Sequence, residues 1–237
     1  MKPKISLVIP IHNEEKIVEK IILDIDKKMK GVFGNSFEII CSENGSSDRT
    51  LEILRRIEIK RPEIKVSSIA EANIGKALRQ GYLSATGKYL ANASVDWYDV
   101  EFIKSSMPLL KKNDIVVGTK SRPGCDQRPI FRRVISHGYN FALKTLFGLK
   151  VTDTHSLIVY NRKKVANIIK LAVMGRSVFS SEVIIRAQYR NLRIIERDII
   201  VHEERKRKKS IVLRTFKAFS DLIMLRIILW MENIKKI

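Results

Sequence analysis

Up to about residue 120, short apolar runs alternate with amphipathic helical patterns, and this alternation constrains the fold more than any other feature. Strands are predicted at 5–10, 37–42, 64–69, 88–93 and 114–119, and helices at 14–30, 47–60, 74–86 and 100–112. The strand segments are almost continuously apolar, which is typical of strands that helices cover on both faces. The repetition predicts an α/β fold with a Rossmann-like, mostly parallel sheet flanked by helices and joined by right-handed crossovers.

After residue 120 the rhythm changes. A polar loop rich in Gly and Pro precedes a predicted helix at about 130–147. Further elements are predicted as helices at 162–171 and 180–190 and as strands at 156–160 and 193–201. Residues 211–237 have the pattern of one or two amphipathic helices. We therefore expect one domain, residues 1–210, followed by a C-terminal amphipathic helical extension, residues 211–237.

The formal net charge of +20 predicts an anionic partner or surface. Nucleic acid, nucleotide phosphates and an acidic lipid leaflet all fit that charge, and so does a Lys-rich, heat-adapted proteome without any partner. No aromatic residue interleaves with the basic run at 205–209, which argues against a nucleic-acid binder. The two cysteines cannot form a disulfide framework, and Cys41 is expected in the core.

The start of the chain leads directly into the first predicted strand without the pattern of a signal peptide. No apolar run approaches the ~20 residues needed to span a bilayer. We expect a soluble or peripheral protein on these grounds.

Polar turns follow the first two predicted strands, at 10–15 and 43–50. In the second turn, Ser46, Ser47 and Asp48 offer N-cap oxygens to the next helix. Open α/β sheets bind ligands in the crevice at the carboxyl ends of their strands. The two turns therefore predict a nucleotide site, with a pyrophosphate in the crevice where the first, second and fourth strands end.

Several side chains near these turns suit a nucleotide. Glu43, Asn44 and Glu14 can accept hydrogen bonds from a base and a ribose, although Glu14 equally suits a helix N-terminus. Lys76 begins a helix and can reach phosphate oxygens together with main-chain N–H groups. A solvated surface lysine is the competing interpretation of Lys76.

Four segments in order resemble the family-2 glycosyltransferases, which have the nucleotide-sugar-binding A-type fold. These segments are residues 8–14, 43–50, 73–89 and 94–96. The resemblance implies the glycosyltransferase A-type fold and adds Pro10, His12 and Ser94 to the nucleotide-binding residues.

The segment 94–96 stands where the family has Asp-x-Asp. The resemblance implies that Asp96 is catalytic and binds a divalent metal, Mg²⁺ or Mn²⁺, that bridges the diphosphate. Ser94 replaces the first Asp, and Asp99 is a candidate to compensate for it. A plain turn carboxylate is the alternative role for Asp96. The family also usually has Asp where this chain has Glu43 and Asn44.

The downstream half is similar to the dolichyl- or polyprenyl-phosphate mannose and glucose synthases. The similar segments are 118–120, 132–136, 153–156, 179–182 and 205–210. Arg132 and Arg133 are candidate catalytic residues, and with Lys120 and Ser136 they are the candidates for holding an acceptor phosphate. The resemblance implies that one of the two arginines holds the lipid phosphate, and we expect the other to point to solvent. It also places Arg205 and Ser210 at the nucleotide.

We therefore expect an inverting hexosyltransferase that moves mannose or glucose from GDP-mannose or UDP-glucose to a membrane polyprenyl or dolichyl phosphate. A phosphate acceptor is already ionised and needs positioning more than a general base. Asp153 and His155 are the candidate bases if the acceptor is instead a hydroxyl of a glycan or lipid. A non-catalytic relative that binds nucleotide or membrane is the alternative outside the enzyme class.

The expected location is cytoplasmic and peripheral, at the cytoplasmic face of an anionic membrane. The cations at 205–209 and the amphipathic segment carrying Trp230 have the composition of an interfacial helix. The same segment could instead pack on the core of its own domain or on a partner in a homodimer.

Overall fold

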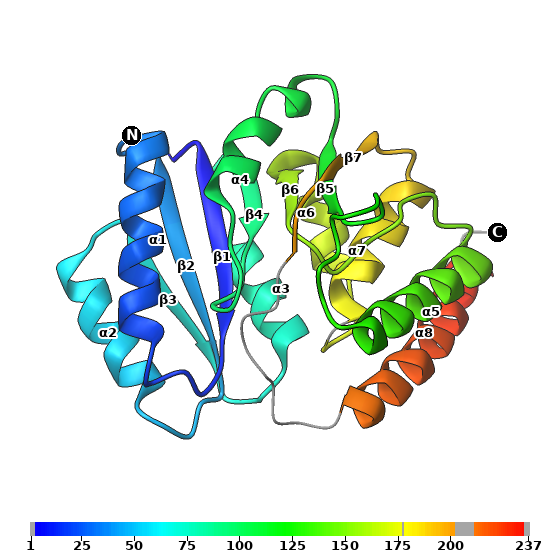
Figure 1. Ribbon diagram of the computed structural model, residues 1–237, viewed down its shortest axis with the longest axis horizontal. Coiled ribbons are helices and arrows are strands. Elements are labelled where there is room, and N and C mark those ends of the chain that lie inside the picture. The colour runs from blue at the N-terminus through cyan, green and yellow to red at the C-terminus, as the bar shows by residue number, and fades with distance from the viewer. Residues whose placement is uncertain (1–2, 177, 202–210, 235–237) are drawn as a thin grey trace.

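The computed structural model describes residues 3–176, 178–201 and 211–234, with side chains of 211–216 and 233–234 excepted. Its centre is a seven-stranded sheet with the order β3-β2-β1-β4-β6-β5-β7 (Figure 1). The strands are β1 (Ile5–Ile11), β2 (Phe37–Asn44), β3 (Ile64–Ile69), β4 (Tyr89–Asn92), β5 (Ile115–Thr119), β6 (Ile158–Asn161) and β7 (Ile194–Asp198). All the pairings are parallel except those of β6, which runs antiparallel to both β4 and β5. The predicted mostly parallel sheet is confirmed.

Helices cover both faces of this sheet. They are α1 (Val18–Phe33), α2 (Thr50–Lys60), α3 (Ile74–Ser84), α4 (Val100–Ser106), α5 (Ile130–Phe147), α6 (Arg162–Leu171), α7 (Val178–Tyr189) and α8 (Ile211–Ile234). Along β1, Leu7 and Ile9 enter the core under α1, α2 and α4, while Val8 enters the core under α3, α6 and α7. Continuous apolar strands are required because each face meets a helical layer.

The predicted helix at 100–112 is wrong as a single element. It divides into α4 and a 3₁₀ turn, η1 (Leu109–Lys111), on either side of Pro108. Proline has no N–H to donate, and its ring clashes with the carbonyl of the residue four positions earlier, so the α-helix ends before it.

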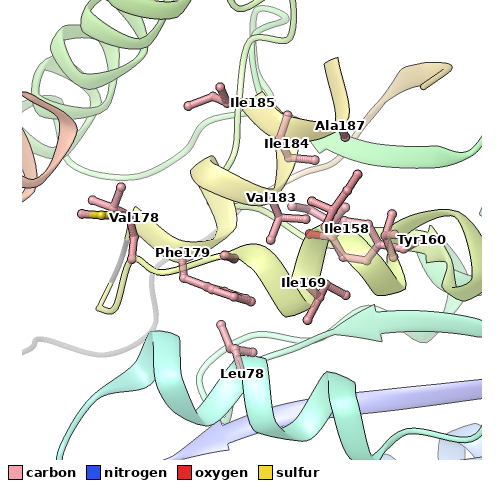
Figure 2. Packing of buried hydrophobic residues seen from close by; sticks show 14 of the residues in the cluster. Leu78, Ile158, Tyr160, Ile169, Val178, Phe179, Val183, Ile184, Ile185 and Ala187 are labelled. Carbon is pink, nitrogen blue, oxygen red and sulfur yellow. The ribbon is translucent and has the colours of Figure 1, made fainter. Parts of the chain in front are cut away.

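The C-terminal segment forms one helix, α8, through its described residues. Leu222, Leu225 and Leu229 are buried in the same core as α7. Figure 2 shows part of this core, in which Phe179 of α7 points toward the helix that carries Leu78. The segment thus packs on its own chain, which was one of the two predicted roles. The predicted domain boundary at residue 210 stays a prediction, because residues 202–210 lie outside the described part.

Candidate active site

The turns after β1 and β2 are tied together at the carboxyl edge of the sheet. The main-chain N–H of Asn13 donates to Ser46 Oγ (3.0 Å), and the N–H of Ser47 donates back to Asn13 Oδ1 (2.8 Å). Asn13 has a φ of 53°, a left-handed conformation that asparagine tolerates better than most residues. Nδ1 of His12 donates to the carbonyl oxygen of Asn44 (2.8 Å), so the ring proton resides on Nδ1. The two turns therefore form one surface.

The first of these turns holds two more predicted nucleotide residues. Pro10 lies within β1 opposite Ser42 of β2 and is half-buried. Glu14 follows the turn, and its main-chain N–H donates to Thr50 Oγ1 at the start of α2 (2.8 Å). Both residues lie where β1 and β2 end, as predicted.

Glu43 and Asn44 point inward and brace the second turn. Glu43 accepts hydrogen bonds from Ser68 Oγ and from the N–H of Ser46, both at 2.5 Å. Burial alone would raise the pKa of Glu43, but these hydrogen bonds outweigh it and hold the pKa below its ordinary value. The side-chain oxygen of Asn44 accepts from the N–H of Asn73. Contacts of Glu43 and Asn44 with a base or ribose stay a prediction.

Asn73 connects three segments that are distant in sequence, and its role was not predicted. Its Oδ1 caps α3 by accepting from the N–H of Lys76 (3.2 Å), and it also accepts from the N–H of Arg176 (2.8 Å). Next to it, Gly75 packs so tightly on Gly175 that a Cβ there would lie 2.5 Å from a main-chain carbon. The signal was available, because Asn in front of a helical pattern is a strong N-cap.

The ammonium of Lys76 forms an ion pair with Glu71, and both side chains are exposed. Lys76 thus lies at the N-terminus of α3 as predicted, with its charge shared with a neighbouring carboxylate. That hydrogen bond lowers the pKa of Glu71.

Asp96 lies in a tight turn just after β4. The turn is closed by Ser94 and Trp97, whose N–H donates to Ser94 Oγ (3.1 Å). Asp99 does not join Asp96, because its Oδ1 caps α4 by accepting from the N–H of Phe102 (2.8 Å). In the described part of the chain, no three His, Cys, Asp or Glu side chains gather as a metal site. The role of Asp96 as a metal ligand stays a prediction.

The reversed direction of β6 brings a second set of polar residues to the same edge. Asn92, at the end of β4, donates from Nδ2 to the carbonyl of Ser156 (3.1 Å) and accepts from the N–H of Ile158 (2.7 Å). The loop before β6 therefore lies beside the turn that carries Asp96. On its other side, the N–H of Gly118 in β5 donates to the carbonyl of Leu157 (2.8 Å).

Lys120 follows β5 and forms an ion pair with Asp153 in that loop. Only 12% of the Lys120 side chain and 4% of the Asp153 side chain are exposed. The other oxygen of Asp153 accepts from the N–H of His155 (2.8 Å). The predicted phosphate-binding lysine is thus held by a buried carboxylate, and that carboxylate was a candidate base in the sequence.

The start of α5 carries the other residues predicted for the acceptor phosphate. Arg128 makes a two-pronged ion pair with Asp126 (2.8 and 2.7 Å) and donates to Ser136 Oγ (3.0 Å). Arg132 is half-buried and, four residues before Ser136, lies on the same face of α5, whereas Arg133 is exposed. Of the two arginines, Arg132 is the one that faces the basic loop.

Arg205 and Ser210 lie outside the described residues. The chain leads toward them from Val201, whose N–H donates to the carbonyl of Cys125 (2.9 Å) and whose carbonyl accepts from the N–H of Gln127 (3.1 Å). Val201 therefore lies beside the loop that precedes α5.

A surface hollow of about 510 Å³ lies at the opposite, amino-terminal edge of the sheet. Two of the cations that line it are paired with carboxylates, Lys65 with Glu38 and Lys30 with Glu63. We expect the site at the carboxyl edge instead, because open α/β sheets bind ligands at the carboxyl ends of their strands.

Comparisons with known proteins identify the family of the chain. The model of glycosyl transferase family 2 matches residues 6–169. Dolichyl-phosphate beta-glucosyltransferase of Saccharomyces cerevisiae is 25% identical over 248 residues, which cover 94% of this chain and 74% of the relative. Dolichol-phosphate mannosyltransferase of Pyrococcus furiosus is 26% identical over 194 residues, covering 78% of this chain but only 53% of the relative.

Among solved structures, glucosyl-3-phosphoglycerate synthase from Mycobacterium tuberculosis, in complex with Mn²⁺, UDP and glucosyl-3-phosphoglycerate, superposes with a TM-score of 0.69. It is 16% identical, and the match covers 94% of this chain and 80% of that one. This likeness concerns the fold, and it confirms the A-type arrangement. Because the family model spans more than half of the sequence, the chain belongs to glycosyl transferase family 2 and is a glycosyltransferase.

Proposed function

We propose that this enzyme transfers a hexose, mannose or glucose, from a nucleoside diphosphate sugar to a membrane polyprenyl or dolichyl phosphate, with inversion at the anomeric carbon. The observation that carries the proposal is the position of β6. Its preceding loop brings Lys120 and Asp153 beside the turn of Asp96. A basic acceptor region thus adjoins the crevice for the donor. The relatives named above act on dolichyl phosphate, which agrees with this arrangement.

The donor, GDP-mannose or UDP-glucose, would lie across the ends of β2, β1 and β4. In the sheet order, β1 lies between β2 and β4. The chain adds β2 and β3 on one side of β1 and then adds β4 on the opposite side of β1. Such a reversal point is where open α/β sheets bind nucleotides. The joined turns of His12, Asn13 and Ser46 line the nucleotide half of this crevice, and Lys76 lies at the helix N-terminus that faces a phosphate.

A divalent cation, Mg²⁺ or Mn²⁺, fits this site with Asp96 as its one ligand from the described side chains. Mg²⁺ commonly takes one or two carboxylates and completes its shell with substrate phosphate and water. When bound, such a cation neutralises charge on the departing diphosphate.

The acceptor phosphate oxygen would attack the anomeric carbon from the side opposite the diphosphate. The new bond joins this carbon to the acceptor oxygen, and the bond to the diphosphate breaks, releasing the nucleoside diphosphate. The acceptor is already an anion, so no proton must be removed. Arg132 and Ser136 would position it, because guanidinium forks match phosphate oxygens. Asp153 is engaged by Lys120 and His155, which suits positioning rather than proton abstraction.

We further propose that the enzyme acts at the cytoplasmic face of a membrane as a peripheral protein. Within the described residues, no helix has the length and apolar character to cross a bilayer. The net charge of +20 favours an anionic surface. A homodimer stays a prediction.

The test is product formation by the full chain with radiolabelled GDP-mannose and UDP-glucose, each with polyprenyl phosphate, in the presence of Mg²⁺, Mn²⁺ or a chelator. We expect label in a lipid extract from one donor and loss of that label with the chelator. Polyprenol without the phosphate serves as the matched acceptor. Transfer to the polyprenol instead would indicate a hydroxyl acceptor. Absence of a metal-dependent thermal shift with either donor would favour a non-catalytic relative.

A further inference from the structure

The helices α5 and α8 lie side by side and form an outer layer of the molecule beyond α7 (Figure 1). Each buries one face in the same core: α5 through Tyr139 and Leu143, and α8 through Leu222 and Leu225. Tyr139 also meets Phe219 of α8 edge to face, with ring centroids 6.1 Å apart. Because the inner faces share one core, the outer faces of both helices point away from it together.

The outer face of α5 exposes four large apolar side chains between its first residue and position 141. Ile130, Phe131, Val134 and Phe141 are exposed by 75%, 55%, 62% and 71%, respectively. Their spacing follows the helical repeat, so they form one stripe. Four large apolar side chains on one helix face in water exceed the scattered exposure that is normal for a protein surface.

The outer face of α8 continues this apolar surface. Ile223, Ile227 and Trp230 are exposed by 58%, 51% and 58%, respectively. They recur at intervals of four and three residues, again on one face of the helix. Trp230 adds a side chain that favours the boundary between hydrocarbon and headgroups.

The charges around this surface are of one sign. The sequence of α5 contains no acidic residue, and Arg133 and Lys144 are exposed on it. Lys217 and Arg226 are exposed on α8.

The two acidic residues of α8 are both engaged by cations of the domain. Asp221 lies 3.8 Å from Arg176, and Glu232 accepts two hydrogen bonds from Arg186 (2.6 and 2.8 Å). Neither carboxylate therefore offsets the basic residues that border the apolar surface.

We infer that the joint outer face of α5 and α8 docks on a lipid bilayer that contains anionic headgroups. The apolar stripes enter the boundary of the hydrocarbon while the flanking cations meet the headgroups. The inference rests on the proposed function for its purpose, because docking through α5 brings Arg132, next to Phe131, to the level of a lipid phosphate. The sequence predicted membrane contact only for the C-terminal helix, and this inference adds α5 as an equal part of the docking surface.

Charge favours a bilayer over a second copy of this chain. A two-fold symmetric dimer would place the same patch against itself. Arg133, Lys144, Lys217 and Arg226 would then border their own copies with no acidic partner on the described outer faces. Like charges across an interface are unfavourable. An anionic leaflet instead supplies the missing negative charge.

The experiment is sedimentation of the full chain with vesicles of phosphatidylcholine mixed with phosphatidylserine, and with vesicles of pure phosphatidylcholine. We expect binding to the mixed vesicles. The double variant Phe141→Ser, Ile227→Ser should bind about tenfold or more weakly, because two apolar side chains no longer enter the lipid. The matched control is Ile59→Ser on α2, which removes a side chain exposed by 86% on the other side of the sheet and should leave binding within about twofold.

Equal vesicle binding by the wild type and the double variant would overturn the inference. So would a wild-type dimer in analytical ultracentrifugation that the double variant dissociates, without vesicle binding by either. Transfer to polyprenyl phosphate in detergent separates the two proposals. Vesicle binding without transfer contradicts the proposed transferase activity alone. Transfer in detergent without vesicle binding contradicts the docking surface and the peripheral location, and leaves the proposed transfer reaction standing.

Discussion

The main-chain N–H of Asn73 donates to the side-chain oxygen of Asn44, and this contact joins the end of β2 to the start of α3. Asn73 Oδ1 in turn accepts a hydrogen bond from the main-chain N–H of Arg176. The guanidinium of Arg176 lies 3.8 Å from the carboxylate of Asp221 on α8. Asn44 therefore braces the turn after β2 from the inner side.

Replacement of Asn44 by Ala should lower both stability and nucleotide affinity. The N–H of Asn73 would keep the main-chain carbonyl of Glu71 as an acceptor (2.7 Å) and lose the one from Asn44, which costs about 0.5–1.5 kcal/mol of unfolding free energy. Asn44→Asp keeps an acceptor oxygen and should restore most of both properties. Denaturant unfolding and calorimetric nucleotide titration measure the two effects. Equal nucleotide affinity in Asn44→Ala and the wild type would show that the turn holds its shape unaided.

Gly75→Ala should be strongly destabilising, because the new Cβ would lie 2.5 Å from the main chain of Gly175. We expect a loss of about 1–3 kcal/mol, as for other overpacked sites. Gly31→Ala on α1 is the matched control, since nothing lies within 4 Å of its added Cβ, and removing a helical glycine should gain up to about 1 kcal/mol. Thermal unfolding compares the two. A Gly75→Ala protein as stable as the control would contradict the close packing.

Asp96→Ala should abolish transfer while leaving the fold intact, because Asp96 is half-buried at a turn that Ser94 and Trp97 close without it. We expect turnover to fall by about 100-fold or more with little change in Tm. Asp99→Ala should do the reverse, losing about 1 kcal/mol of stability with its helix cap and retaining turnover. Turnover of Asp96→Ala close to that of the wild type would remove the metal assignment.

Arg132→Ala should raise the KM for the lipid phosphate at least tenfold, since a charged hydrogen bond contributes about 1.5–3 kcal/mol. Arg133→Ala is the matched control on the exposed side of the same helix turn and should change this KM much less. Steady-state kinetics in detergent, with the donor saturating, separates the acceptor effect from membrane docking. The opposite order of effects would mean that Arg133 holds the phosphate.

Stability should depend on pH through Glu38. Burial alone would raise its pKa, but hydrogen bonds from Lys65, Ser6 and Thr86 lower the pKa to about 2. Because the folded pKa lies below the unfolded value of about 4.3, the carboxylate stabilises the fold above that pH. This stabilisation disappears as the pH falls toward about 2.

Glu38→Gln should therefore lose about 2 kcal/mol at neutral pH, after allowance for screening at Lys65. Its unfolding free energy should also fall less steeply than that of the wild type between about pH 4.5 and 2. Denaturant titrations across this range measure both slopes. Parallel slopes would show that Glu38 is not the group responsible.

The sequence was sufficient for most of the fold because strands buried on both faces must be apolar throughout. The strand at 37–42 and the helix at 130–147 were predicted within two residues of their observed bounds. The direction of β6 could not be predicted, because antiparallel and parallel strands in a buried sheet share the same composition. The division of the helix at Pro108 was predictable, because proline interrupts an α-helix. The helical periodicity of the residues around Pro108 outweighed that signal in the prediction.

The meeting of the polar turns at one edge of the sheet was predictable, and the contacts of the candidate site residues were less so. The polar turns at the ends of β1, β2 and β4 do lie together, as the order β2-β1-β4 requires. The pairing of Lys120 with Asp153 joins residues 33 positions apart in sequence, which no local pattern encodes. The inward direction of Glu43 depends on Ser68 of β3, a neighbour that only the sheet order supplies.

The antiparallel course of β6 has an evolutionary consequence. Each parallel strand brings the loop that follows it to the carboxyl edge of the sheet, whereas β6 brings the loop that precedes it. Under the proposed function, a change in the segment ahead of β6 would alter the molecule that receives the sugar, while the hydrogen bonds that shape the nucleotide half would remain as they are. One reversed strand thus allows a single scaffold to diversify its products.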